Sequence, residues 1–115
     1  MNLPQDWICY QKTNDDKYWD AVDHVMDLTS SNPEALWNFI KETLNSPDCD
    51  DTVISNLAAG PLEDLMNRKG KQFIDRVVVE ARQSVKFNNL LGGVWESGID
   101  PEVWQKIESI RKKVW

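Results

Sequence analysis

Apolar residues recur along most of this chain at intervals of three and four, the spacing that places them on one face of an α-helix. The clearest run begins at Pro33 and ends before Pro47. Its apolar residues are Leu36, Trp37, Ile40 and Leu44. Asn32 stands before the proline as a helix cap, and Glu34 places a carboxylate where the helix dipole favours negative charge. The pattern therefore predicts a helix that starts at Pro33 and ends before Pro47.

Further runs with the same spacing precede and follow this one. Their apolar residues are Tyr18, Trp19, Val22, Val25 and Met26; Val53, Ile54, Leu57 and Ala58; Leu62, Leu65 and Met66; Phe73, Ile74, Val77, Val78 and Ala81; Val85, Phe87, Leu90 and Leu91; and Val103, Trp104, Ile107 and Ile110. We expect Gly60-Pro61 to end one helix and start the next, and Gly70 and Gly92 to end helices, because glycine stops and proline starts them. Residues 77–79 are all valine and favour a strand by propensity, but the flanking residues keep the helical period.

These runs predict an all-α protein: a compact bundle of about six or seven short helices, or alternatively a short α-solenoid of antiparallel helix pairs. A chain of 115 residues is long enough for one hydrophobic core and too short for two. We therefore expect residues 1–115 to form a single helical domain. Residues 1–14 are predicted to be an irregular N-terminal arm, held against the core by Trp7 and Ile8.

Charge is distributed unevenly between the two halves of the chain. Residues 1–51 hold eleven acidic and three basic residues, a net charge of −8, whereas residues 52–115 have a net charge of +2. Four acids are spaced so that a helix would align them: Asp16, Asp20, Asp23 and Asp27. Like charges at this spacing destabilise a helix by roughly 0.2–0.5 kcal/mol per pair. Folding does not require such a row of carboxylates, whereas a basic partner would; the alternative is that the row is an ordinary solvated helix face.

Three sequence blocks carry a resemblance to a known family. They are AAGPLEDL at Ala58–Leu65, GKQFIDRV at Gly70–Val77 and GGVW at Gly92–Trp95. With these blocks the chain resembles a bacterial domain family of unknown function, made of small acidic helical proteins, over roughly residues 16–110. The resemblance implies a compact helical domain, bacterial or phage-borne, and implies no activity.

The polar residues of these blocks have a structural interpretation. Glu63 and Asp64 fall in the first turn of a predicted helix, where carboxylates favour the positive end of the dipole. We expect Asp75 and Arg76 to pair with neighbours across helices, with Asp64–Arg76 as one candidate ion pair, and expect Trp95 to insert between helices. The alternative is functional: Glu63, Asp64, Asp75 and Arg76 would line a polar pocket.

The sequence contains no catalytic constellation, no metal-ligand spacing and no cofactor motif. His24 is the single histidine and is expected to be exposed on a helix, and Cys9 and Cys49 are expected to be free thiols, with a disulfide as the alternative. A sequence pI near 4.7 argues against direct binding of nucleic acid. No apolar run approaches the roughly 20 residues that span a bilayer, and the stretch MNLPQDWICY lacks the basic flank and apolar region expected of a secretory signal. We therefore expect a cytoplasmic protein that does not bind membranes.

These features predict a protein–protein inhibitor rather than an enzyme, specifically an immunity protein that neutralises a bacterial toxin through an acidic face. The expected partner is a basic protein, a toxin or another nucleic-acid-handling enzyme, because complementary charge speeds association. The predicted contact residues are Asp16, Asp20, Asp23, Asp27, Asp48, Asp50 and Asp51, with Trp19 and Trp37 as aromatic anchors. One alternative is a phage-encoded inhibitor that mimics nucleic acid against a host defence complex. Another is a small enzyme or ligand-binding domain that uses the Glu63–Arg76 region.

Overall fold

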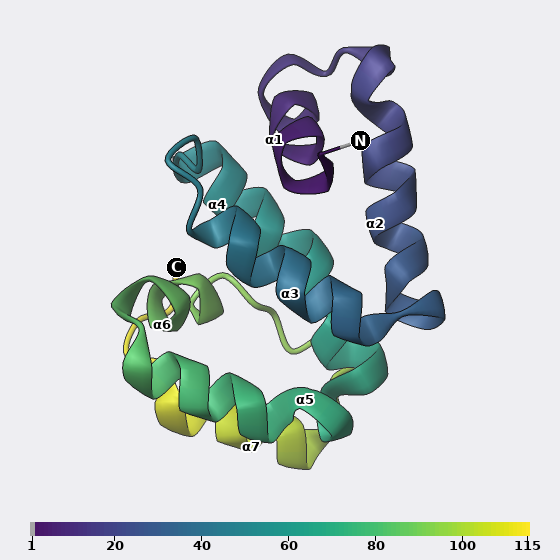
Figure 1. Ribbon diagram of the computed structural model, residues 1–115. Helices are drawn as coiled ribbons and strands as arrows, with labels where there is room; N and C mark the ends of the chain where they lie inside the picture. Colours follow the sequence, from purple (N-terminus) through teal and green to yellow (C-terminus); the bar gives the residue numbers. More distant parts are fainter. Residues whose placement is uncertain (1) are drawn as a thin grey trace.

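The computed structural model describes residues 2–115, which form seven α-helices, one 3-10 turn and one π-helical turn (Figure 1). The elements are α1 (Leu3–Thr13), η1 (Asp16–Tyr18), α2 (Trp19–Ser31), α3 (Pro33–Leu44), α4 (Asp51–Leu57), η2 (Ala58–Leu62), α5 (Glu63–Gln83), α6 (Val85–Leu91) and α7 (Pro101–Ile110). No strand occurs in the described residues, and residues 77–79 are helical. The all-α prediction is confirmed.

The helices close into a bundle with a radius of gyration of 13.3 Å. Helix α1 packs against α2, α3 and α4, and α5 packs against α2, α3, α6 and α7. In a solenoid each helix pair contacts only its neighbours in sequence, so these contacts identify the bundle. Figure 1 shows α1 and α2 at one end of the molecule, and α5 and α7 side by side at the other. Within residues 2–115, every helix is too short or too polar to cross a bilayer.

Aromatic side chains connect the helices through the core. Trp7 of α1 meets Phe39 of α3 edge-on, with 5.6 Å between ring centroids. Trp37 meets Phe87 of α6 in the same manner at 5.5 Å, and lies 6.2 Å from Phe73 of α5. Offset and edge-on ring pairs of this kind contribute about 0.5–1.5 kcal/mol beyond their buried area. The core therefore includes residues from both ends of the bundle.

The N-terminal arm predicted for residues 1–14 is wrong over the described residues, because Leu3–Thr13 is a helix. Asn2 caps it by accepting a hydrogen bond from the Gln5 backbone N–H at 3.2 Å, and Pro4 stands in the first turn. Trp7 and Ile8 are buried, so their expected role in holding this segment is confirmed. The start of the helix carries the asparagine and proline signal that also opens α3.

The sequence predicts that Gly60-Pro61 ends one helix and starts the next, but the structure has no such break there. The backbone continues from α4 into α5 through a π-helical turn, in which the Glu63 N–H donates to the Ala58 carbonyl five residues earlier. Proline has no N–H and breaks the i to i−4 pattern, and a wider turn accommodates it. The result is one bent helical path from Asp51 to Gln83.

The helix end expected at Gly70 falls one residue earlier. The backbone leaves helical geometry at Lys69, where φ is −130° and ψ is 20°, so α5 consists of two helical segments joined across a kink. A Cβ atom at Gly70 would lie 2.9 Å from a methyl group of Val103 in α7. This glycine therefore permits the close approach of α7 to α5, which is a packing role that a single sequence does not distinguish from a helix stop.

The segment after α7 returns across α6. The Trp115 N–H donates to the Gly92 carbonyl at 2.9 Å, and a Cβ atom at Gly93 would lie 2.3 Å from the Trp115 ring. The Arg111 guanidinium donates to the Val94 carbonyl at 3.1 Å and lies 4.7 Å above the Trp104 ring. These contacts fix the backbone of residues 111–115 beside α6.

Candidate functional site

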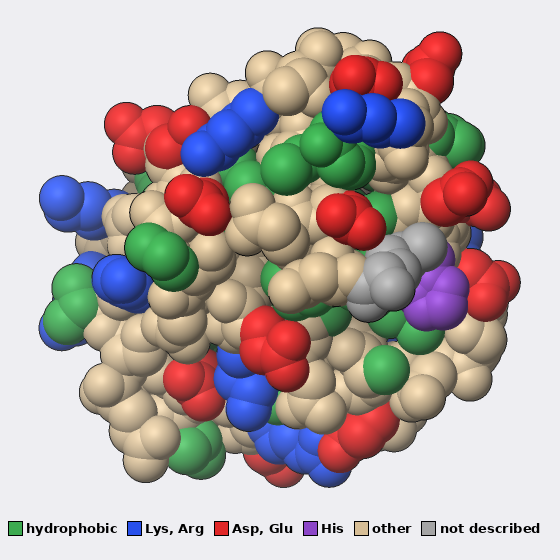
Figure 2. All heavy atoms as spheres, turned by 45° about the horizontal axis from the view of Figure 1, so that its top comes forward, with side chains coloured by type: hydrophobic (Ala, Val, Ile, Leu, Met, Phe, Trp, Pro, Cys, Tyr) green, Lys and Arg blue, Asp and Glu red, His purple; other side chains and the backbone are tan. Residues whose placement is uncertain are grey.

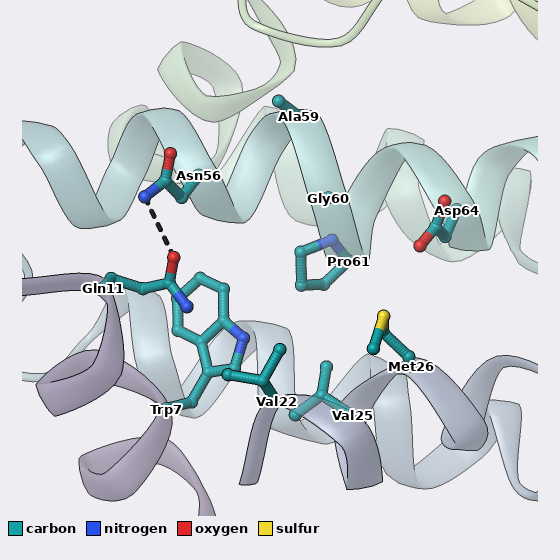
Figure 3. Close-up of a pocket in the computed structure, with 10 residues that line it drawn as sticks. All are labelled: Trp7, Gln11, Val22, Val25, Met26, Asn56, Ala59, Gly60, Pro61 and Asp64. Atoms are coloured by element: carbon teal, nitrogen blue, oxygen red, sulfur yellow. Dashed lines mark hydrogen bonds between the residues drawn. The ribbon is translucent and has the colours of Figure 1, made fainter. Parts of the chain in front are cut away.

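The acidic end of the molecule contains a groove between α1 and α2 on one side and the α4–η2–α5 path on the other (Figure 3). The groove has a volume of about 340 Å³. We call it the α2 groove; its lining residues are Trp7, Gln11, Val22, Val25, Met26, Asn56, Ala59, Gly60, Pro61 and Asp64. In Figure 3 the side chains of Val22, Val25 and Met26 project from α2 toward Pro61 and Asp64 on the opposite wall. Most of this lining is apolar.

Polar groups mark the two ends of the α2 groove. At one end the Asn56 side-chain amide donates to Gln11 Oε1 at 2.9 Å. At the other end, partial burial raises the pKa of the Asp64 carboxyl, and the nearby Arg68 guanidinium opposes this rise. A carboxylate that has lost part of its hydration gains more from a partner cation than a fully hydrated one. Asp64 is therefore suited to receive a positive group at the end of an otherwise apolar groove.

Two large apolar side chains on α2 remain accessible beside the groove. Met26 is 49% exposed, and Trp19 is 44% exposed and meets Tyr10 edge-on with 5.4 Å between ring centroids. Trp19 is therefore exposed, as expected, and its role as an anchor stays a prediction. Exposed aromatic and thioether groups next to an apolar groove are typical of protein-binding surfaces.

The carboxylates of α2 lie next to this apolar row. Trp19, Val22 and Met26 are each followed directly by an acid, so Asp20, Asp23 and Asp27 form a parallel row turned by about 100° around the helix. Asp16 in η1 precedes them, and we call the four acids the acidic stripe. All four are exposed, and none forms an ion pair with another residue of 2–115. The expected row of unpaired carboxylates is therefore present.

The acids predicted at the turn before α4 do not extend the stripe. Asp48 and Asp51 are exposed, but Asp50 caps α4 by accepting from the Val53 N–H at 3.0 Å and lies 3.8 Å from the Lys12 ammonium. Figure 1 shows α1 between the start of α4 and α2. Figure 2 shows acidic side chains spread over the face that carries this end of the molecule, with Lys and Arg between several of them. The acids are local features on separate elements rather than one continuous rim.

The prediction of Trp37 as an anchor for a partner is wrong. Its side chain is only 4% exposed, because it packs between α5 and α6, and the Lys41 ammonium lies 5.2 Å above the ring. The helical pattern placed Trp37 on an apolar face correctly but gave no information on whether that face was covered.

The proposed polar pocket of Glu63, Asp64, Asp75 and Arg76 does not form. Glu63 accepts a hydrogen bond from the Trp95 backbone N–H at 2.8 Å, and Asp64 lines the α2 groove. Asp75 pairs with a lysine of α7, with 3.6 Å between Lys106 Nζ and the carboxylate. Arg76 binds both carboxylate oxygens of Glu34. Asp75 and Arg76 share only a shallow depression with residues 37, 41, 79 and 80.

Two structural expectations for the same residues are also wrong. The ion pair between Asp64 and Arg76 is not formed, because Arg76 binds Glu34 and twelve residues of the kinked helix α5 separate it from Asp64. Trp95 does not insert between helices: its side chain is 72% exposed, and only its backbone is held, by Glu63. The GPLEDL and GVW blocks therefore meet through a hydrogen bond from the Trp95 backbone N–H to the Glu63 side chain.

The described residues contain no group of three His, Cys, Asp or Glu side chains placed to hold a metal ion. His24 lies at the surface, as expected, and is visible in Figure 2. Cys9 and Cys49 are free, which confirms the favoured expectation. Burial raises the pKa of the Cys49 thiol and Asp50 adds to this rise, while Lys86 and Lys12 oppose it. A thiol with a raised pKa is a weaker nucleophile at neutral pH because little of it is thiolate.

Several groove residues escaped the sequence analysis: Gln11, Asn56, Ala59 and Pro61. No local signal identifies them, since they come from segments brought together only by the bundle. The resemblance of the chain to a family of unknown function is confirmed by comparison. No curated protein and no solved structure matches the chain. Residues 10–115 match the model described as "Family of unknown function (DUF6869)", and with nearly its whole length matched the chain belongs to that family.

Proposed function

We propose that this protein is an inhibitor that binds a basic protein along α2, and that its biological role is immunity to a bacterial toxin. The observation that carries the proposal is the adjacency of two rows on α2, exposed apolar side chains and unpaired carboxylates, at the edge of an apolar groove. On this proposal the protein acts by binding and not by catalysis, in the cytoplasm.

The two rows would have separate tasks. The acidic stripe would attract a positively charged surface and raise the association rate, since complementary charge accelerates encounter by about 10 to 10³. Trp19 and Met26, together with the α2 groove, would hold an apolar side chain of the partner and limit dissociation. Asp64 would receive a lysine or arginine next to that side chain. The partner segment that fits is one that alternates basic and apolar residues.

The carboxylates support this proposal because their position costs stability. Asp20 and Asp23, and Asp23 and Asp27, are like charges at helical spacings of three and four, each pair destabilising α2 by roughly 0.2–0.5 kcal/mol. Lysine or arginine in place of Asp23, which belongs to both pairs, would remove the repulsion. A binding role accounts for acids at all of them.

The test starts with capture of the partner from a native host by the tagged protein. The expected result is a basic protein that is retained at low salt, is released as salt rises and is toxic when expressed alone. Co-expression of the present chain should restore growth. If the captured protein is instead a subunit of a host defence complex, the phage-inhibitor alternative replaces immunity.

Two triple variants make the test specific. Asp20→Asn/Asp23→Asn/Asp27→Asn removes the α2 carboxylates while keeping side chains of similar shape and helix propensity. Glu42→Gln/Glu96→Gln/Glu102→Gln removes three exposed and unpaired acids from other helices and loops, so both variants change the net charge equally. Growth rescue should be lost only in the first. Equal rescue by both variants would falsify the assignment of the partner surface to α2.

A further inference from the structure

The opposite end of the molecule contains a second hollow, lined by the end of α5, by α6 and by the segment after α7. Its volume is about 390 Å³. We call it the basic hollow; its lining residues are Ala81, Arg82, Val85, Lys86, Asn88, Asn89, Lys112 and Lys113. Four of these eight side chains are cationic and none is acidic. Figure 1 places α6 and the C-terminal end together, across the molecule from α2.

The four cations of the basic hollow have no carboxylate partner in residues 2–115. Six Lys and Arg side chains elsewhere form ion pairs: Lys12, Lys17, Lys71, Arg76, Lys106 and Arg111. The chain as a whole carries an excess of acids, with a net charge of −6. Four unpaired cations around one concavity of such a protein are therefore available to an external anion.

One buried side chain builds this arrangement. Asn88 is 5% exposed, and its amide donates to the Ile110 carbonyl at 3.0 Å and to the Ala81 carbonyl at 3.3 Å. Its oxygen accepts from the Lys112 backbone N–H at 2.9 Å. Both N–H donors and the oxygen of this amide are therefore used to join α5, α6 and the C-terminal segment. Lys112 and Lys113 consequently extend from a backbone that is fixed beside the hollow.

We propose that the basic hollow is a binding site for a compact ligand with several phosphate groups. A di- or triphosphate carries three to four negative charges near neutral pH, which four cations neutralise, and phosphate oxygens accept charge-assisted hydrogen bonds from arginine and lysine. The volume lies within the range of about 300–1,000 Å³ typical of small-molecule sites. Val85, which is 85% exposed at the edge, adds an apolar contact.

A compact polyanion fits better than nucleic acid. A long polyanion would extend beyond the hollow onto a protein of net charge −6 and meet repulsion along most of its length. A compact polyanion stays inside the hollow and interacts only with its four cations. This site is separate from the α2 groove, so either proposal can fail without the other.

Inorganic tripolyphosphate is the probe for this site, with calorimetry for affinity and amide NMR shifts for location. The expected result is saturable binding, with shifts confined to residues 81–89 and 111–113 and to the Asn88 side-chain amide. Citrate and a single-stranded oligonucleotide should bind at least tenfold more weakly. Equal binding of citrate would overturn the assignment to phosphate, and tighter binding of the oligonucleotide would assign the hollow to nucleic acid instead.

Paired variants separate the site from general charge. Lys86→Gln/Lys112→Gln should weaken tripolyphosphate binding at least tenfold while the melting temperature stays near that of the parent, because both side chains are exposed and unpaired. Lys17→Gln/Arg68→Gln removes the same two charges from exposed positions outside the hollow and should leave the affinity within about twofold. Similar losses in the two variants, or shifts spread over residues 68–71 as well, would reduce the binding to nonspecific ion pairing and end the proposal.

Discussion

The α2 groove and the basic hollow are of similar size and opposite charge, and they are built in different ways. The carboxylates beside the groove come from one helix face, so the helical repeat alone sets their spacing. The cations of the hollow come from the junction of α5 and α6 and from the segment after α7, which is distant in sequence, and one buried amide holds these parts together. A charge row on one helix is visible in a sequence, whereas a charge cluster made by tertiary contacts is visible only in the fold.

The largest effect should come from removing the α2 carboxylates and measuring association with the captured partner. We expect Asp20→Asn/Asp23→Asn/Asp27→Asn to slow association on the order of tenfold to a hundredfold at low salt, and less as salt rises, because steering is screened. Unfolding free energy should stay constant or rise slightly. Lys86→Gln/Lys112→Gln, on the opposite surface, should not slow association. If Lys86→Gln/Lys112→Gln instead associates more slowly than the α2 variant, the partner binds the basic hollow and not α2.

The next largest effect concerns the apolar row of α2. Trp19→Ala should raise the dissociation rate of the partner about thirtyfold, corresponding to the 2 kcal/mol or more typical of an aromatic anchor. Trp95→Ala is the matched control, because Trp95 is also an exposed tryptophan and lies away from the α2 groove. Surface plasmon resonance on both variants measures the two rates. An equal change in both variants would remove Trp19 from the contact surface.

Asn88→Ala tests the claim that a buried amide builds the basic hollow. Three backbone groups lose their partner, so we expect a loss of about 1–3 kcal/mol in the free energy of unfolding, measured by urea denaturation. Asn89→Ala is the control, since Asn89 lines the same hollow but is exposed. Tripolyphosphate binding should also weaken in the first variant. Equal stabilities would mean that other contacts hold the C-terminal segment.

The smallest effect concerns Asp64. Partial burial raises the pKa of its carboxyl, although the nearby Arg68 guanidinium opposes this rise. When the pKa of a carboxyl is higher in the folded protein than in the unfolded one, the protonated form stabilises the fold. Stability therefore falls as pH rises through the folded pKa and the group ionises. Asp64→Asn should therefore raise the melting temperature slightly near pH 7. Because the group remains accessible, the gain should be well below 1 kcal/mol. The difference from the parent should disappear below the ordinary pKa of aspartate.

The same substitution should weaken partner binding, because the amide offers no charge to a basic group. A variant that is more stable and binds less well would indicate a residue kept for function at a cost to the fold. A loss of stability together with a loss of binding would instead give Asp64 a structural role.

Helices with local start signals were predictable from the sequence. Asn32 caps α3 as expected by accepting from the Ala35 N–H, and Asp100 caps α7 in the same way by accepting from the Glu102 and Val103 N–H groups. Asn2 gives α1 the same signal, but its polar sequence has a weak apolar pattern and was interpreted as an arm. Caps act between residues two or three apart, which is why a single sequence is enough to read them.

Gly70 and Trp37 show what sequence interpretation leaves out. The glycine next to two cations matched a helix stop, and the helix does kink at Lys69, but the missing side chain also makes room for Val103 of another helix. The tryptophan lay on a correctly predicted apolar face, but whether a partner or the core covers that face depends on α5 and α6. Both outcomes depend on contacts between helices, which periodicity does not encode. For the same reason the acidic stripe was predicted and the α2 groove beside it was not.

The π turn at residues 58–62 has a consequence for the whole molecule. Such a turn holds one residue more than an α turn. The extra residue sets the rotation of α5 about its axis relative to α4. Deleting one residue there would rotate everything downstream by about 100°. Leu65 and Phe73 would turn away from the first half of the protein, and the Phe73 ring would no longer meet Trp37 of α3. The π turn at Pro61 therefore determines which face of α5 packs against the first half of the protein.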